Sequence, residues 1–435
     1  MALGIEHRKE PLANFPDEIY QFGGATGQGG GVPRVAASYS VSEAFLEAAI
    51  PIVQDTSGFQ DFTFELGFRY SDYSTSGAEE TWKTGINWAF NDSWRIRGGF
   101  NRAVRAPNLW DLYVPLRFGL GGSNDICAGS SPTATPEQCA RTGVSAAQYG
   151  TILPNPADQY NNLGGGNVYL IPETADTFTA GFVWTPVNIP GLSLALDYYD
   201  IEVDDTIDAL GFDDILQQCA NTGDATLCGL INRDSVGTLW LTTAGHIENT
   251  NQNIGLLHAE GIDMNLTHVL TLGEKGYMPI DFQGSYTLTD TFTNPLVSYD
   301  CVGYFGFQCG QATPEWRHRM RATWESRANF NVSLGWRYVG EVDVDDASSN
   351  PDIGDPAAME EWRINGIDKI SAQSWFDLAG SYAFKNGTQL TVGINNIFDK
   401  EPPLAPTFND DNDINLYSVY DPLGRYAFAS FEYRF

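Results

Sequence analysis

Extended segments in which every second residue is apolar recur along this chain, and they constrain its fold more than any other feature. In FTFELGFRY at 62–70, aromatic and aliphatic residues alternate with polar, charged or small ones, so a strand would place them on one face. The pattern returns in TWKTGINW at 81–88 and WRIRGGFN at 94–101, and it closes the chain in RYAFASFEYRF. Counting one strand for each such segment predicts about fourteen strands, an even number.

The connections between these segments predict how the strands are joined. Asn91 and Asp92 form a tight turn, and PVNIPG at 186–191 and KNG at 385–387 are further short connections, whereas the connections between them are long. We interpret this as a strict alternation of short and long connections. Outer-membrane barrels have short periplasmic turns and long extracellular loops, whereas a sandwich or propeller would space its strands evenly. The sequence therefore predicts an all-β fold, a transmembrane antiparallel β-barrel.

Composition limits the classes of partner. Aromatic residues at 13%, 45 glycines and only 18% charged residues fit many strands and turns better than helices. No window approaches the eighteen or so uncharged apolar residues of a membrane helix, so a membrane-spanning form of this chain must be a barrel. The formal net charge of −31 argues against nucleic acid and against an anionic membrane surface as partners.

The cysteines indicate the redox compartment. Each lies in a stretch between predicted strands, and the six form three close pairs: Cys127 with Cys139, Cys219 with Cys228, and Cys301 with Cys309. None of the pairs has CxxC spacing, which favours three local disulfides over a zinc site. Each bond would contribute roughly 3 kcal/mol by restricting the unfolded chain. Disulfides indicate an oxidising compartment such as the periplasm or cell surface; the alternative is six reduced cysteines in a cytosolic protein.

Four motifs resemble those of the TonB-dependent outer-membrane receptor family, in the family's order. They are FELGFRYSDYS at 64–74, FNRAVRAPNLWDLY at 100–113, EGIDMNLTHVL at 260–270 and LTVGINNIFDKEPP at 390–403. The resemblance runs from about residue 2 to residue 435 and implies the outer membrane of a Gram-negative bacterium, with lipid around the barrel. It also implies that Tyr433 and the terminal Phe435 belong to a signal read by the barrel-assembly machinery.

The resemblance covers only part of what the family contains. Family members have a barrel of about 22 strands with a plugged lumen, and a short segment that binds TonB precedes the plug. Neither the plug nor that segment is recognisable in this sequence. We expect residues 1–435 to be the C-terminal portion of the barrel, about two-thirds of it, from a truncated reading frame. The TonB complex would then be reached only through the missing N-terminal part. MALGIEHRKEP lacks the apolar core of a signal peptide, which places any export signal upstream.

No arrangement of residues suggests catalysis, a cofactor or a metal site. The five histidines are scattered, and GxSxG, HExxH and P-loop motifs are absent, so we do not expect an enzyme. The alternation predicts that four arginines of adjacent strands point into the barrel lumen: Arg317, Arg319, Arg321 and Arg337. The resemblance implies that such charges meet the plug, a structural role that we prefer to one in binding substrate.

Three functions remain open at this stage. The first is an active-transport receptor for a scarce small-molecule or metal-chelate ligand, such as a ferric siderophore, a cobamide or an oligosaccharide, energised through TonB. The second is a passive outer-membrane channel with a closed barrel of about fourteen strands, which requires the first and last strands to pair. The third, a soluble surface-anchored all-β enzyme, is disfavoured by the missing catalytic residues and the outward aromatic residues.

We expect ligand specificity to lie in the three disulfide loops, because loops on a rigid scaffold can vary without disturbing the fold. Bracing of long loops against proteolysis is the alternative role, and we slightly prefer it. Candidates for direct ligand contact are the aromatic and amide residues inside the third cysteine pair: Tyr304, Phe305, Phe307 and Gln308. The aromatic girdles at the edges of the lipid-facing band are expected to include Trp82, Trp316, Trp336, Tyr338 and Trp375.

Overall fold

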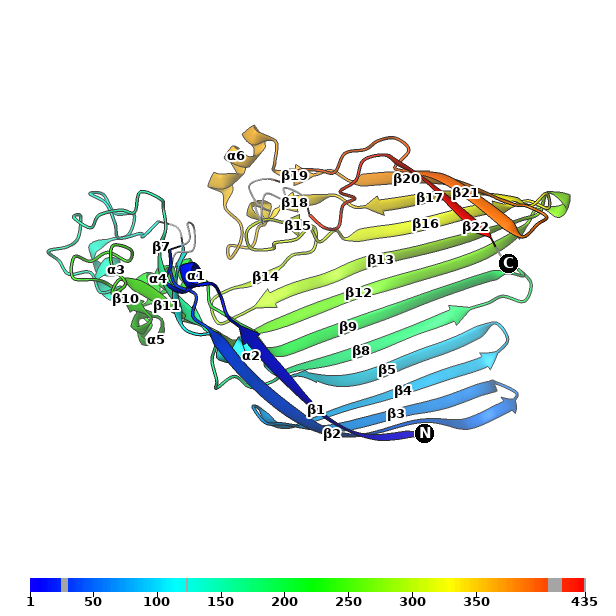
Figure 1. The fold of residues 1–435 in the computed structure, drawn as a ribbon, viewed down its shortest axis with the longest axis horizontal. Helices are drawn as coiled ribbons and strands as arrows, with labels where there is room; N and C mark the ends of the chain where they lie inside the picture. The colour runs from blue at the N-terminus through cyan, green and yellow to red at the C-terminus, as the bar shows by residue number, and fades with distance from the viewer. Residues whose placement is uncertain (25–29, 123, 406–416, 434–435) are drawn as a thin grey trace.

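One large antiparallel sheet dominates the computed structural model, which describes residues 1–24, 30–122, 124–405 and 417–433 (Figure 1). Fifteen strands form this sheet within the described residues, and β14 (Ser298–Asp300) lies off the main path, beside β13. The remaining strands, in pairing order, are β1 (Ala2–Asn14), β2 (Val35–Thr56), β3 (Phe59–Tyr73), β4 (Gly77–Asn91), β5 (Trp94–Arg105), β8 (Glu173–Trp184), β9 (Leu192–Asp208), β12 (Gln252–Thr271), β13 (Tyr277–Thr293), β16 (Trp316–Glu325), β17 (Phe330–Val339), β20 (Gln373–Ala383), β21 (Thr388–Asn395) and β22 (Tyr426–Tyr433). This confirms the all-β class and the strand number expected from the sequence.

Shorter elements lie in the long connections. Two small sheets are built there, one in the order β10-β11-β7-β6 and one in the order β15-β18-β19. The short elements are α1 (Glu18–Gln21), α2 (Leu109–Tyr113), β6 (Arg117–Gly121), α3 (Pro136–Arg141), β7 (Tyr160–Gly165), α4 (Phe212–Thr222), α5 (Ala225–Gly229), β10 (Ile231–Asn232), β11 (His246–Thr250), the 3₁₀ helix η1 (Gly273–Lys275), β15 (Tyr304–Phe305), β18 (Val342–Val344), the 3₁₀ helix η2 (Asp345–Ala347), α6 (Pro356–Asn365) and β19 (Lys369–Ile370). No helix in the described ranges is long and apolar enough to cross a membrane.

The large sheet has one apolar face and one polar face. On the apolar face, Phe68 of β3 lies opposite Leu46 of β2 and Trp82 of β4, and all three side chains are exposed. On the polar face, the Arg97 guanidinium of β5 donates to the Asp197 carboxylate of β9 over 2.6 Å. Exposed apolar side chains on one face and ion pairs on the other are the arrangement of a barrel wall with lipid outside and water inside.

Long and short connections lie at opposite ends of the strands (Figure 1). The short turns include 57–58, 92–93 and 326–329, whereas 106–172 and 209–251 are among the long connections at the other end. The predicted strict alternation is wrong at one place, because β3 and β4 pair as far as Tyr73 and Gly77 and a tight turn at 74–76 closes them. Gly77 has φ +85°, a backbone conformation that suits glycine.

The sheet is open. β1 and β22 stand at the two ends of the strand order, and within the described residues each pairs on one side only. Figure 1 shows them at opposite borders of the sheet. Their backbone donors and acceptors on the outer side are therefore unpaired within this part of the chain, which lipid cannot tolerate. Tyr433 lies opposite Thr388 of β21, whereas Phe435, the other residue of the expected assembly signal, lies outside the described residues.

The girdle expectation is wrong for Trp375. This side chain is 2% exposed and lies opposite Arg337, on the polar face. Trp336 and Tyr338 have the opposite orientation, since Arg337 alternates with both of them along β17. The error arises because Trp375 stands near the loop end of β20, where the polar face is covered by loops and can bury a tryptophan.

Charge placed on the apolar face tests this assignment. Val392 of β21 lies between Gly380 and Ala429 on the apolar face. Val392→Arg should destabilise the folded protein in lipid vesicles by roughly 2–4 kcal/mol if the residue lies near the bilayer midplane. The matched control, Thr391→Arg, places the same charge on the polar face and should be close to neutral. Urea titration in vesicles measures both, and equal costs would contradict the assignment of the faces.

Candidate functional site

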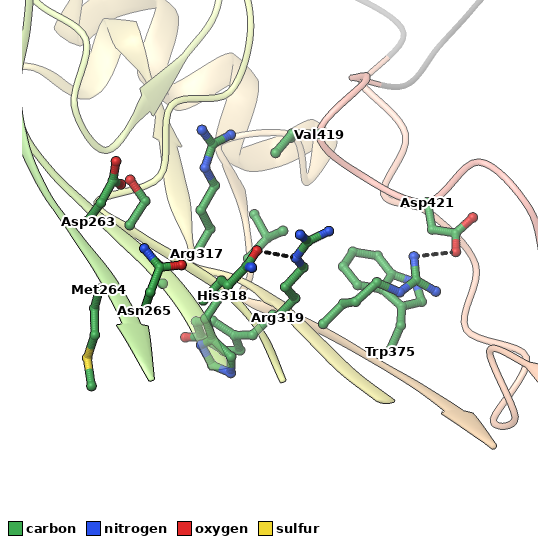
Figure 2. Close-up of a pocket in the computed structure, with 15 residues that line it drawn as sticks. Asp263, Met264, Asn265, Arg317, His318, Arg319, Trp375, Val419 and Asp421 are labelled. Carbon is green, nitrogen blue, oxygen red and sulfur yellow. Dashed lines mark hydrogen bonds and ion pairs between the residues drawn. The ribbon is translucent and has the colours of Figure 1, made fainter. Parts of the chain in front are cut away.

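A cavity of about 500 Å³ opens on the polar face (Figure 2). We call it the arginine cavity. Strand alternation brings Arg317 and Arg319 of β16 to this face, and the register places Arg337 of β17 directly opposite Arg319. The polar and aromatic residues that line the cavity include Asp263, Asn265, Gln283, Ser285, Arg317, Arg319, Arg337, Trp375 and Asp421.

Arg337 is held from three sides. Its guanidinium pairs with Asp377 of β20 at 3.2 Å and with Asp421 at 2.7 Å, and its Cζ lies 5.8 Å from the centre of the Trp375 ring. Asp421 comes from the segment before β22 (Figure 2). This arginine therefore ties the sheet to that segment, and most of its charge is compensated.

The other arginines are not compensated in this way. Arg319 donates to the Gln283 side chain over 2.7 Å, and Arg321 donates to the Ser333 hydroxyl over 3.1 Å. In the part of the chain that the structure describes, neither of these arginines nor Arg317 forms an ion pair with a carboxylate. In a chain with a net charge of −31, such a group creates a local positive potential and favours anions. Two carboxylates on the same face reduce this potential: Asp263 of β12, which also lines the cavity, and Asp281 of β13, which lies directly opposite Arg321.

The four predicted arginines thus share one face, but they do not share one cavity. Arg321 lies further along β16 and lines a neighbouring hollow of about 410 Å³ with Asp281, Gly335 and Asp377. Sequence reasoning missed Trp375 and Asp421 as parts of the site. Asp421 follows a long connection and carries no local signal that it would meet Arg337.

Trp375, at the edge of the arginine cavity, packs in a cluster of buried aromatic residues. Trp375, Tyr417 and Tyr420 are each at most 2% exposed and belong to one hydrophobic cluster. Within the described ranges, the Trp375 Nε1, Tyr417 Oη and Tyr420 Oη atoms have no hydrogen-bond partner. Burial raises the pKa of the Tyr420 hydroxyl to about 12 and that of Tyr417 still further. Both hydroxyls therefore remain protonated and able to donate at neutral pH.

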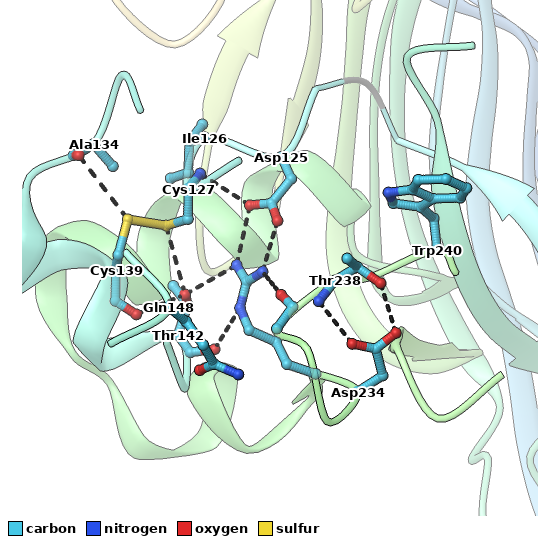
Figure 3. Close-up of polar contacts among 12 residues, drawn as sticks. Asp125, Ile126, Cys127, Ala134, Cys139, Thr142, Gln148, Asp234, Thr238 and Trp240 are labelled. Atoms are coloured by element: carbon cyan, nitrogen blue, oxygen red, sulfur yellow. Dashed lines mark hydrogen bonds and ion pairs between the residues drawn. A yellow bond between two sulfur atoms is a disulfide. The ribbon is translucent and has the colours of Figure 1, made fainter. Parts of the chain in front are cut away.

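The first two disulfides lie inside a folded loop unit. Cys127–Cys139 and Cys219–Cys228 form as expected, and their sulfurs pack in two adjoining hydrophobic clusters. Arg233 joins the two long loops, because its guanidinium is bidentate to Asp125, with distances of 2.6 and 3.0 Å (Figure 3). Both side chains of this pair are less than one-tenth exposed.

The third disulfide, Cys301–Cys309, is also formed, and a buried carboxylate anchors its loop. Asp345 is 1% exposed, and its Oδ2 accepts from the backbone N–H groups of Gln308 and Cys309 at 2.8 and 3.0 Å. These contacts connect 301–309 to the next long connection. They agree with the bracing role that we preferred for the disulfides, and they leave the loop's part in ligand specificity as a proposal.

The four ligand candidates in this loop have different surroundings. Phe305 is 1% exposed, with its ring 5.8 Å from the Tyr417 ring, so it packs in the interior of the loops. Tyr304 lies beside it in β15 and is partly buried. Phe307 is 63% exposed and lies near Trp362 of α6. The Gln308 side chain is exposed. Phe307 and Gln308 are therefore the candidates that offer a side-chain surface.

Comparison with known proteins identifies the family. Residues 3–397 match the family model described as "TonB dependent receptor-like, beta-barrel". A curated relative, the probable TonB-dependent siderophore receptor PirA of Acinetobacter baumannii, is 22% identical over 432 residues, which are 97% of this chain and 47% of the relative. The chain therefore spans about half the length of the relatives it matches.

Solved structures share the fold. The crystal structure of PirA from Acinetobacter baumannii superposes with a TM-score of 0.60 at 16% identity and covers 100% of this chain and 52% of that one. A ferric enterobactin receptor mutant, PfeA of Pseudomonas aeruginosa in complex with enterobactin, gives a TM-score of 0.61 at 17% identity, with 99% of this chain and 50% of that one covered. At these identities the likeness concerns the fold alone.

The buried ion pair predicts how the loop unit responds to mutation. Arg233→Met leaves the Asp125 carboxylate buried without a counter-charge and should destabilise the loop unit by about 3–5 kcal/mol. Arg363→Met is the matched control, because Arg363 pairs with Glu360 on an exposed surface and should cost less than about 1 kcal/mol. Limited proteolysis of 106–251 at increasing urea concentrations measures the loss in the first variant and should show none in the control, because Arg363 lies in α6, outside this unit. Equal resistance of the two variants would contradict the structural role of the pair.

Proposed function

The chain belongs to the TonB-dependent receptor family, whose members are outer-membrane β-barrels of Gram-negative bacteria and not enzymes, and on that premise we propose that it forms the barrel wall of a siderophore-uptake receptor. The single observation that carries the proposal is the arginine cavity. Arg317 and Arg319 face it without carboxylate partners in the described part of the chain. A ferric siderophore with a net negative charge would find both positive potential and hydrogen-bond donors there.

We further propose that residues 1–435 are the C-terminal portion of a larger barrel. Two observations support this: the relatives are about twice as long as the matched region, and β1 and β22 each have one unpaired side in the described sheet. Strands of the same protein that pair with these two edges would complete the backbone hydrogen bonding that lipid requires.

Membership in the family supports a proposal for the energy source and the partners. Uptake would be driven by the TonB complex, which would act through the N-terminal part of the receptor. Outer-membrane lipid would contact the apolar face, and the barrel-assembly machinery would insert the chain. A plug in the lumen would face the same arginines, so these side chains would contact either the plug or the ligand at different stages of transport. Cobamides and oligosaccharides remain alternative cargoes of the same route.

A passive channel is the second candidate. A self-sufficient pore requires β1 to pair with β22 so that no sheet edge meets lipid. The open order of the described strands counts against that closure. Planar-bilayer recordings from the purified chain would favour the channel if they showed steady conductance.

Ligand binding tests the receptor proposal. A panel of ferric siderophores, beginning with ferric enterobactin, is supplied under iron limitation to a strain whose one siderophore receptor is the full-length protein. Growth of the strain shows which siderophore the receptor takes up. For the siderophore that supports growth, Arg317→Gln combined with Arg319→Gln should weaken binding at least tenfold, since a hydrogen bond to a charged group contributes about 1.5–3 kcal/mol. Arg321→Gln, on the same strand but outside this cavity, is the control and should bind as the parent does. Unchanged affinity in the double variant, or a panel with no growth at all, would contradict the proposal.

A further inference from the structure

Gln283 of β13 anchors one arginine of the arginine cavity through a neutral group. Its Oε1 accepts from Arg319 Nε over 2.7 Å, and both side chains line the cavity (Figure 2). Arginine carries N–H donors and no acceptor, so the amide oxygen is the atom that faces it. Arg319 forms no further side-chain hydrogen bond and no ion pair with the described residues. The N–H groups on its two Nη atoms are therefore available to a ligand.

The strand register places amides and arginines in one row across the polar face. Asn265 of β12 lies opposite Gln283, and Gln283 lies opposite Arg319 of β16. Arg319 in turn lies opposite Arg337 of β17. Side chains at paired positions share a face of the sheet. From β12 to β17 this row therefore presents two amides and two guanidinium groups, and it contains no carboxylate.

The two arginines that face each other differ in the charge of their partners. Arg337 pairs with the carboxylates of Asp377 and Asp421 at 3.2 and 2.7 Å, whereas the partner of Arg319 is an uncharged amide. Like charges directly opposite each other destabilise an antiparallel strand pair. A carboxylate at position 283 would offset that repulsion through a charge-assisted hydrogen bond. Because Gln283 stands there instead, Arg319 keeps a charge that an anionic ligand can neutralise.

The carboxylates nearest to Gln283 on this face lie in the neighbouring rows. Asp263 lies opposite Ser285 in one row, and Asp281 lies opposite Arg321 in the other. Rows on one face are two residues apart along each strand, which is roughly 7 Å. In the part of the chain that the structure describes, neither carboxylate forms an ion pair with Arg319. They lower the local potential without occupying the donors of Arg319, whose side chain is exposed.

We propose that Gln283 determines the charge selectivity of the arginine cavity. It is a positioning residue: it fixes Arg319 through Nε, leaves the Nη groups to the ligand and adds no negative charge of its own. An anionic chelate can then pair with Arg319, whereas a neutral or cationic chelate gains nothing from it. This inference rests on the proposed uptake function, and it names the residue that makes the cavity select an anionic cargo.

The electrostatic potential of the cavity can be measured without any siderophore. In the full-length receptor, Ser285→Cys places a thiol on the cavity wall, and an anionic and a cationic thiosulfonate reagent modify it at rates that report the local charge. The receptor without this cysteine gives the background rate. Adding Gln283→Glu should shift the ratio of the two rates about threefold or more toward the cationic reagent. Gln283→Leu removes the anchor but adds no charge, so it should leave the preference for the anionic reagent.

Siderophore affinity shows whether the ligand uses this charge. For the siderophore that supports growth, Gln283→Glu should weaken binding about tenfold or more, because the new carboxylate pairs with Arg319 and repels the anion. Gln283→Leu should weaken it only about two- to fivefold, since the charge remains but its position is no longer fixed. Asn87→Asp is the matched control. The Asn87 side chain accepts from Arg95 over 2.6 Å on the same face, outside the cavity, and this variant should bind as the parent does.

The two measurements separate this inference from the uptake function. An unchanged ratio of modification rates in Gln283→Glu would overturn the proposal, and so would a changed ratio with unchanged siderophore affinity. A growth-supporting siderophore without net negative charge would overturn it as well. If no siderophore supports growth, the uptake function fails, and the rate ratio still decides whether Gln283 sets the charge of the cavity. Equal resistance of all variants to trypsin shows that the barrel remains folded.

Discussion

Every backbone N–H and C=O group that enters lipid must find a hydrogen-bond partner within the protein, because lipid offers none. This requirement explains the long succession of antiparallel strands, in which each inner strand pairs on both sides. It also explains why β1 and β22 are the parts of the sheet that need further partners. The apolar face, with side chains such as Phe68 and Val392 exposed, makes sense only where lipid covers it.

Buried hydrophobic side chains are consequently concentrated in the loops and not in the sheet. Ile215, Leu239 and Ile247 are fully buried among the long connections, and the second loop unit has its own cluster around Val344 and Trp375. Disulfides and buried charged groups stabilise these units where a small core cannot do so alone. The arginine cavity is bordered by the second of these units through Trp375.

Much of this arrangement can be predicted from the sequence because it follows from local periodicity. Alternation along 317–321 puts three arginines on one face whatever the details of the fold, and close spacing in the sequence identifies the cysteine partners. Features set by contacts between distant segments could not be predicted. Neither the burial of Trp375 and Phe305 nor the bond from Asp421 to Arg337 has a local signal. The pairing of β7 with β11 joins two separate loops, so the small sheet was beyond sequence reasoning too.

The central claim is that the arginine-bearing face of the sheet faces water and the opposite face faces lipid, and accessibility along β16 tests it most directly. All six cysteines of residues 1–435 are in disulfides, so a single cysteine introduced at each position from 317 to 322 is the only free thiol in these residues. In the receptor in native outer membranes, a charged water-soluble maleimide should label Arg317→Cys, Arg319→Cys and Arg321→Cys. A lipid-soluble maleimide should label His318→Cys, Met320→Cys and Ala322→Cys. Labelling without this two-residue period, or with the two reagents exchanged, would contradict the account.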